Sequence, residues 1–171
     1  SAPTLQELQE ASPQFETALL QDVLSAAQRI QTETNTPFPP QLIIGLLKGF
    51  KGGFRPDNLL GISPDIAQRY GIQDLSKKAD NFYAGGMYLW DLTHETGTLT
   101  AASLRYYEGP KDSAAAYSSE ARAFAETVTA EGGDALTLES LAANVSNAVS
   151  APLAPQTSKS TIPGIRPEDL Q

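Results

Sequence analysis

The centre of this 171-residue chain reads Asn81-Phe82-Tyr83-Ala84-Gly85-Gly86-Met87-Tyr88-Leu89. The stretch continues without a proline to Glu95, and Gly97 follows two residues later. Glycine just past the last helical residue is a common helix end, because it adopts the left-handed backbone conformation without strain. We therefore predict a helix over residues 81–95.

Helix signals flank this stretch on both sides. Residues 41–50 are apolar on nearly every side, which is typical of a helix that runs through the interior of a small domain. The pair Ser63-Pro64 has the form of an N-cap followed by proline in the first turn. We predict further helices over residues 41–50, 63–70, 98–107, 112 or 113 to 129, and 138–149.

The N-terminal region carries two candidate helix starts. Thr4 with Glu7 has the spacing of a capping box, and Ser12-Pro13 has the form of a second start. Beyond them, apolar residues recur at steps of three and four as far as about Thr34, as in an amphipathic helix. These residues are Phe15, Leu19, Val23, Leu24, Ala27 and Ile30. Prolines 37, 39 and 40 then end the helix.

The pattern as a whole predicts an all-α protein in three parts. No alternating run of β-branched residues is long enough to indicate a strand. We divide the chain into an N-terminal helical extension (1–36), a central domain (37–131) and a C-terminal part (132–171). From Ser150 onward, Ala, Pro, Ser and Thr predominate, so we expect an irregular tail that is extended or ordered only against a partner.

Composition excludes several kinds of chemistry. The formal charge is −8, with 20 acidic and 12 basic residues, so we expect no nucleic-acid partner. Only residues 37–78 are basic, with six Lys and Arg against three Asp. The chain has no Cys and one His, and we predict no metal site and no cofactor.

Two features of the sequence bear on where the protein is located in the cell: its hydropathy and its first residues. The longest apolar run, residues 42–47, is far below the roughly 20 residues of a membrane span. The chain begins at Ser1 without a charged and apolar leader, which we interpret as a processed or excised product.

Three blocks of the sequence, in order and spacing, resemble the soluble lytic transglycosylase and goose-type lysozyme family. The stretch 81–89, with Leu92 after it, is similar to that family's Asn-Ile-x-Ala-Gly-Ala-x-Tyr-Leu helix. Residues 59–64, Leu-Leu-Gly-Ile-Ser-Pro, stand where the family has Leu-Met-Gln-Ile-Thr-Pro. Residues 106–110, Tyr-Tyr-Glu-Gly-Pro, are similar to Tyr-Asn-x-Gly-Pro. The resemblance covers roughly residues 40–128. It implies a lysozyme-like helical domain with a glycan groove between two lobes.

The catalytic position of that family is changed in this chain. Residues 51–56, Lys-Gly-Gly-Phe-Arg-Pro, stand where the family has Glu-Ser-x-Phe-x-Pro, so Lys51 replaces the acid that protonates the glycosidic oxygen. An ammonium group, with a reference pKa of about 10.4, is a poor proton donor at neutral pH. Gly61 and Tyr107 replace the family's Gln and Asn, and Tyr107 would fill part of the groove. By resemblance, the groove candidates are Lys51, Asn58, Gly61, Tyr88, Tyr106 and Tyr107.

Each candidate also has a plainer interpretation. Lys51 either contacts acidic groups of peptidoglycan or is a solvated charge at a helix C-terminus, where a cation is favoured. The tyrosines either stack on sugar rings or belong to the core. Glu108 and Asp57 are the acids nearest the motif, and either could be a relocated proton donor or a solvated loop carboxylate.

The sequence leaves three hypotheses for function. The first is a non-enzymatic, transglycosylase-like domain that is a structural or peptidoglycan-docking part of a wall-traversing assembly. Such an assembly is a phage virion or tail, or a secretion or conjugation machine, which implies a bacterial envelope or virion location. Its protein partners would bind through residues 1–36 and 150–171. The second is an active peptidoglycan hydrolase with a relocated acid, and the third is a purely structural helical interaction protein.

Overall fold

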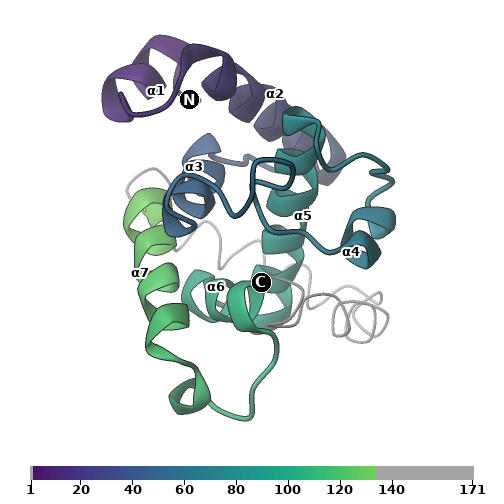
Figure 1. Ribbon diagram of the computed structural model, residues 1–171, viewed down its shortest axis with the longest axis vertical. Helices are drawn as coiled ribbons and strands as arrows, with labels where there is room; N and C mark the ends of the chain where they lie inside the picture. Colours follow the sequence, from purple (N-terminus) through teal and green to yellow (C-terminus); the bar gives the residue numbers. More distant parts are fainter. Residues whose placement is uncertain (1, 134–171) are drawn as a thin grey trace.

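The computed structural model describes residues 2–133, and within this range the protein is all-α. Figure 1 shows the arrangement of the helices. They are α1 (Leu5–Ala11), α2 (Thr17–Thr34), α3 (Pro40–Gly49), α4 (Pro64–Arg69), α5 (Lys78–Thr96), α6 (Leu99–Glu108) and α7 (Ser119–Gly133), with a 3₁₀ turn η1 (Ala114–Ala116) before α7.

Helix α5 is the centre of the fold. Every residue from 81 to 90 is buried, because other elements surround this part of the helix. Helix α2 packs along it, α6 packs against its C-terminal half, and α4 lies beside it. Helix α7 packs on both α3 and α6, which closes the other side of the molecule (Figure 1). The element predicted from the central stretch is thus the one on which the others are assembled.

Helices α1 and α2 share the main core. Leu8 of α1 and Leu20, Val23 and Ile30 of α2 are buried in the same hydrophobic cluster as the residues of α3 and α5. The apolar stripe predicted on α2 therefore has its partner within the chain, chiefly on α5.

The N-terminal helix starts were predicted in part. Thr4 and Glu7 form the predicted capping box, with Glu7 N donating to Thr4 Oγ1 over 3.1 Å and Thr4 N donating to Glu7 Oε1 over 2.8 Å. The second start, at Ser12-Pro13, is wrong: Ser12 is the C-cap of α1, and α2 begins at Thr17. Ser12 N donates to Leu8 O, and this hydrogen bond makes Ser12 the last residue of the α1 hydrogen-bond pattern.

The start of the last described helix is also corrected. The sequence predicted one helix from residue 112 or 113, whereas η1 ends at Ala116 and α7 begins at Ser119. Tyr117 interrupts the helix: its backbone is extended, its side chain is buried, and its hydroxyl donates to Gly109 O over 2.7 Å. Helix α7 runs to Gly133, past the predicted end at 129. The helix predicted over 138–149 and the tail lie outside the described residues.

The remaining predicted helices are confirmed to within a few residues. Ser63 caps α4 by accepting from Ile66 N, and Thr98 caps α6 by accepting from Ala101 N over 3.1 Å. Gly97 ends α5 in the left-handed conformation. Over the described range, no helix combines the length and the hydropathy that crossing a bilayer requires.

Candidate functional site

The three blocks of the resemblance meet around one residue, Leu60. The side chain of Asn81 on α5 accepts from Leu60 N over 2.9 Å and donates to Leu75 O over 3.0 Å. From α6, the Tyr106 hydroxyl donates to Leu60 O over 2.7 Å. Both polar groups of the Leu60 backbone are therefore satisfied by side chains from the other two blocks, which fixes the loop before α4 against α5 and α6.

Asn58, one of the groove candidates, belongs to this buried network. Its Nδ2 donates to Ile62 O over 2.8 Å, and its Oδ1 accepts from Ile62 N over 3.0 Å. The same Oδ1 accepts from Asn81 Nδ2 over 2.8 Å. Gly61 lies inside the loop that Asn58 closes, with φ of 62°, a left-handed conformation that favours glycine. Both residues shape the loop, and neither is exposed.

Tyr88 and Tyr106 are core residues in this structure. Their exposed fractions are 1% and 0%, and their ring centroids lie 5.4 Å apart. Burial raises the pKa of the Tyr106 phenol well above its usual range, because the charged form would lose its hydration. A ligand does not reach side chains without exposed surface, so their contribution to any groove is structural support.

Lys51 lies where α3 has just ended. Its side chain is exposed, its backbone has φ of 58°, and its N–H donates to Lys48 O over 2.8 Å. The next two residues, Gly52 and Gly53, also have positive φ. Residue 51 thus lies in a tight left-handed turn that holds a solvated cation close to the α3 C-terminus, where the helix dipole favours positive charge.

Tyr107 packs against two aromatic rings, those of Phe50, the residue before Lys51, and Phe124 on α7. It stacks on Phe50 with ring centroids 5.9 Å apart, and its ring lies 4.8 Å from that of Phe124 on α7. Phe50 also contacts Phe54, the aromatic residue of the motif, at 5.6 Å. The amide that the resemblance leads one to expect at residue 107 is replaced by a ring that joins α6 to α3 and α7.

The two weaker acid candidates differ in environment. Asp57 is exposed on the loop before α4. Glu108 ends α6, and its Oε1 accepts from Ser118 N over 2.9 Å. Burial raises the pKa of Glu108, but the hydrogen bonds from Ser118 and the charges of Lys111 and Arg122 lower it further, so the net shift is downward. A carboxyl with a lowered pKa is ionised at neutral pH and is a poor proton donor.

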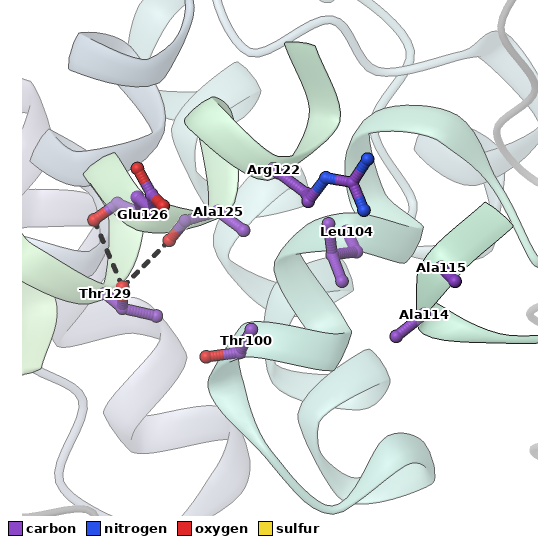
Figure 2. A pocket seen from close by; sticks show the side chains of 8 residues that line it. All are labelled: Thr100, Leu104, Ala114, Ala115, Arg122, Ala125, Glu126 and Thr129. Atoms are coloured by element: carbon purple, nitrogen blue, oxygen red, sulfur yellow. Dashed lines mark hydrogen bonds between the residues drawn. The ribbon is translucent and has the colours of Figure 1, made fainter. Parts of the chain in front are cut away.

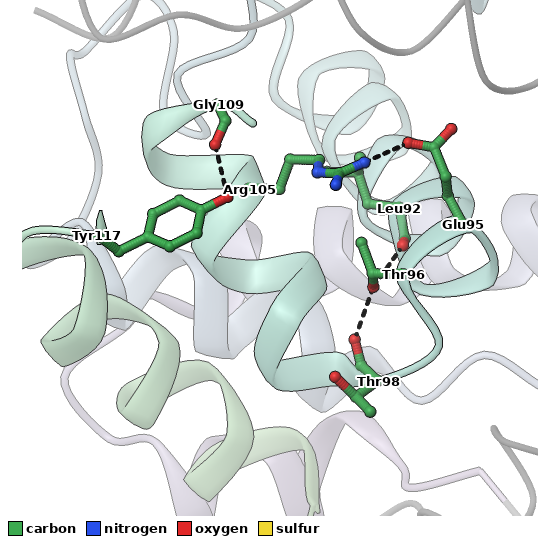
Figure 3. A network of polar contacts seen from close by, with 7 residues as sticks. All are labelled: Leu92, Glu95, Thr96, Thr98, Arg105, Gly109 and Tyr117. Atoms are coloured by element: carbon green, nitrogen blue, oxygen red, sulfur yellow. Dashed lines mark hydrogen bonds and ion pairs between the residues drawn. The ribbon is translucent and has the colours of Figure 1, made fainter. Parts of the chain in front are cut away.

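The contacts drawn in Figure 3 hold α6 in place. Arg105 Nη1 forms a half-buried ion pair with Glu95 of α5 at 2.6 Å. The Thr96 hydroxyl, at the turn between the helices, donates to Leu92 O over 2.8 Å and approaches Thr98 O at 3.1 Å. At the other end of α6, Tyr117 anchors Gly109. Side-chain contacts therefore hold both ends of α6, the helix that contains residues 106–108, in position.

A polar cluster between α4 and α5 was not predicted. The Tyr70 hydroxyl donates a hydrogen bond to Asp91 Oδ2, and the Arg69 guanidinium lies 5.8 Å from the centre of the Tyr88 ring. Burial raises the pKa of Asp91 although the Tyr70 hydrogen bond, His94 and Arg69 lower it. Arg69 Nη1 is buried and makes no hydrogen bond to the described residues. The sequence signal was a single acid, Asp91, in an otherwise apolar stretch of α5.

The structure brings Asn58 together with Leu60, Asn81 and Tyr106 from the three motif blocks. Within residues 2–133, no three His, Asp or Glu side chains are grouped as metal ligands. A pocket of about 350 Å³ lies elsewhere, between α6, η1 and α7 (Figure 2). None of the groove candidates lines this pocket.

Comparisons with protein-family models, with curated proteins and with solved structures found no match to this chain.

Proposed function

We propose that the protein is a catalytically degenerate, lytic transglycosylase-like domain that serves as a structural or peptidoglycan-docking part of an assembly that traverses the bacterial cell wall. The observation that carries the proposal is the aromatic packing beside Lys51. Where the resemblance implies an acid and an amide facing a glycan, the chain has a solvated cation and a Tyr107 ring packed on Phe50 and Phe124.

The hydrogen bonds around Leu60 support retention of a scaffold. Asn81 and Tyr106 occupy motif positions of different blocks, and both bind the Leu60 backbone. These interactions need only the shape of the domain, whereas glycosidic cleavage needs a proton donor of suitable pKa. The chain therefore keeps residues that build the domain and has lost those that the resemblance assigns to chemistry.

An active hydrolase with a relocated acid is less well supported. Glu108 is bound to Ser118 at the start of α7, and its lowered pKa favours the ionised form. Its carboxylate links two helices, which accounts for an acid at this position without catalysis.

The proposed location is the bacterial envelope or a phage virion, with protein partners at residues 1–36 and 150–171. The inner faces of α1 and α2 are buried in the core, so partners of the first segment would bind the outer faces of these helices. Residues 150–171 lie outside the described range.

The test is incubation of the purified protein with peptidoglycan sacculi. Soluble products are examined by mass spectrometry, and protein in the pellet is quantified. We expect the protein in the pellet and no muropeptide release above buffer. Release of anhydro-sugar or reducing-end products would contradict the loss of catalysis. Full recovery in the supernatant, at low and moderate salt alike, would remove glycan docking and leave a purely structural domain.

A further inference from the structure

Helix α7 ends beside the pocket that lies between α6, η1 and α7. The helix runs to Gly133, and residues 134–171 follow it in the chain. Thr129 lines the pocket, and residues four apart share one face of a helix, so Gly133 lies on the face of α7 that borders the pocket. A Cβ at Gly133 would meet nothing within 4 Å. The chain therefore leaves α7 on this open side.

The pocket wall is made largely of small apolar groups. Leu104 of α6, Ala125 of α7, and Ala114 and Ala115 of η1 face it (Figure 2). The hydroxyl of Thr129 is already bonded to Ala125 O over 2.9 Å. The volume of about 350 Å³ equals that of roughly a dozen water molecules at about 30 Å³ each. The pocket thus has room for a row of aliphatic side chains.

The segment that follows α7 carries such a row in its sequence. A helix is predicted over residues 138–149, and its apolar residues recur at steps of three and four, which places them on one face. These residues are Leu138, Leu141, Ala142, Val145 and Val149. Ser140, Asn144 and Asn147 fall on the opposite face. An amphipathic helix of this kind is stable only when an apolar surface covers its stripe.

The lengths fit a helical hairpin between α7 and this segment. Residues 134–137 supply the connection, and antiparallel helix pairs are commonly joined by about 2–5 residues. A helix over 138–149 is about 18 Å long at about 1.5 Å per residue, and α7 rises about 17 Å from Arg122 to Gly133. An antiparallel helix therefore runs along the whole pocket and places Val149 level with Arg122.

The charges at the pocket agree with this arrangement. Arg122 is exposed and forms no ion pair with a residue in the range 2–133, and Figure 2 shows its guanidinium extended above Leu104. The last turn of an antiparallel helix would lie beside this guanidinium, where free carbonyl groups and the helix dipole favour a cation. The Glu126 carboxylate points away from the hollow, so it does not oppose an apolar stripe (Figure 2).

We propose that residues 138–149 form a helix that folds back on α7 and inserts its apolar stripe into the pocket between α6, η1 and α7. The docked helix ends beside η1, so residues 150–171 leave the domain at that end of α7 and not at Gly133. This docking does not depend on the proposed function. If that function holds, the docked helix also fixes where the partner-binding segment 150–171 emerges.

Disulfide formation in the full chain tests the docking, because the sequence contains no cysteine. Thr129→Cys is combined with Ala142→Cys, which the antiparallel helix places level with residue 129. In the matched control, Thr129→Cys is combined with Ala143→Cys, on the opposite face of the predicted helix. A disulfide needs Cβ atoms about 3.5–4.5 Å apart, so the two pairs report which face meets α7. Oxidation is followed by mass spectrometry at several protein concentrations.

We expect the 129–142 pair to form its disulfide within one chain, about tenfold faster than the 129–143 pair, because docking raises the effective concentration of the two thiols. Ala115→Leu fills the pocket and should slow this reaction, whereas Ala116→Leu, in the same exposed turn but outside the lining, should not. Equal rates for the two pairs, or no effect of Ala115→Leu, would overturn the proposal. Disulfides between chains that increase with protein concentration would instead place a second copy in the pocket and also overturn it.

A comparison without cysteine provides an independent check. Val145→Asp puts a charge into the stripe, and Asn147→Asp puts the same charge on the opposite face of the predicted helix. The first should lower the urea midpoint of unfolding and the second should leave it unchanged, because only the first buries a carboxylate. Equal midpoints would overturn the docking. Neither experiment involves peptidoglycan, so their failure would leave the outcome of the sacculus test unaffected.

Discussion

At the scale of single residues, the backbone of Lys51 is strained, with φ of 58°. Among residues 2–133, only Asn35 and Lys51 have positive φ without being glycine, and asparagine tolerates this conformation better than lysine. We expect Lys51→Gly to raise the free energy of unfolding by about 1 kcal/mol relative to Lys51→Ala, which keeps the Cβ. Urea unfolding of both variants measures this difference, and equal midpoints would contradict the strain.

Asp91 gives the protein a pH dependence of known sign. Burial raises its pKa in the folded state above the ordinary value of an aspartate, so the folded protein holds this proton more tightly than the unfolded chain does. The stabilising contribution is complete below the unfolded pKa and is lost as pH rises through the folded pKa. Between those limits, the free energy of unfolding of the wild type should fall relative to that of Asp91→Asn.

Chemical denaturation from pH 3 to pH 8 checks the Asp91 prediction. Asn keeps an oxygen that accepts from the Tyr70 hydroxyl, so the variant retains the α4 contact without a titrating group. The difference in stability between variant and wild type should grow with pH and level off above the folded pKa. A constant difference over the whole range would show that Asp91 titrates as in the unfolded chain.

At the scale of helices, local capping decides where α6 begins. Thr98 accepts from Ala101 N, and its loss leaves that donor without a side-chain partner. We expect Thr98→Ala to lower the free energy of unfolding by about 1 kcal/mol, whereas Thr98→Ser keeps the hydroxyl and should lower it by less. Thermal unfolding that fails to separate Ala from Ser at this position would contradict the role of the cap.

Gly85 sets how closely α5 approaches the loop before α4. A Cβ at this position would lie 2.5 Å from Leu60 Cδ1 and 3.0 Å from the Tyr106 hydroxyl oxygen. Because both neighbours are buried, we expect Gly85→Ala to cost about 1–3 kcal/mol of stability. Gly133→Ala, where a Cβ meets nothing within 4 Å, is the matched control. Equal unfolding midpoints for the two variants would show that the loop yields without cost.

At the scale of the whole molecule, catalysis would need Lys51, Gly61 and Tyr107 all to be replaced by the residues that the resemblance implies. We expect Lys51→Glu to release no muropeptides from sacculi, because Tyr107 and Gly61 still lack the amide groups that the resemblance implies. Mass spectrometry of the soluble fraction tests this, with circular dichroism to verify the fold. Clear turnover by this single variant would show that the groove had remained intact and that only the acid was missing.

The sequence by itself determined the helical class and most helix ends. The capping box at Thr4 and the stop at Gly97 are satisfied by atoms three or four residues away, so local sequence suffices to recognise them. The same reasoning failed at Ser12-Pro13, where two local signals competed and the end of α1 prevailed. It also failed before α7, because Tyr117 is held by a backbone carbonyl on another segment.

Only the tertiary structure decided what surrounds the candidate residues. The sequence singled out Lys51 and Tyr107 as candidate residues, but the packing of Tyr107 on Phe50 and Phe124 depends on three separate elements. The Tyr70–Asp91 pair joins residues 21 positions apart, and its pKa shifts arise from burial between α4 and α5. Helix ends follow from neighbours along the chain, whereas burial, electrostatics and pockets follow from neighbours in space, which no local pattern specifies.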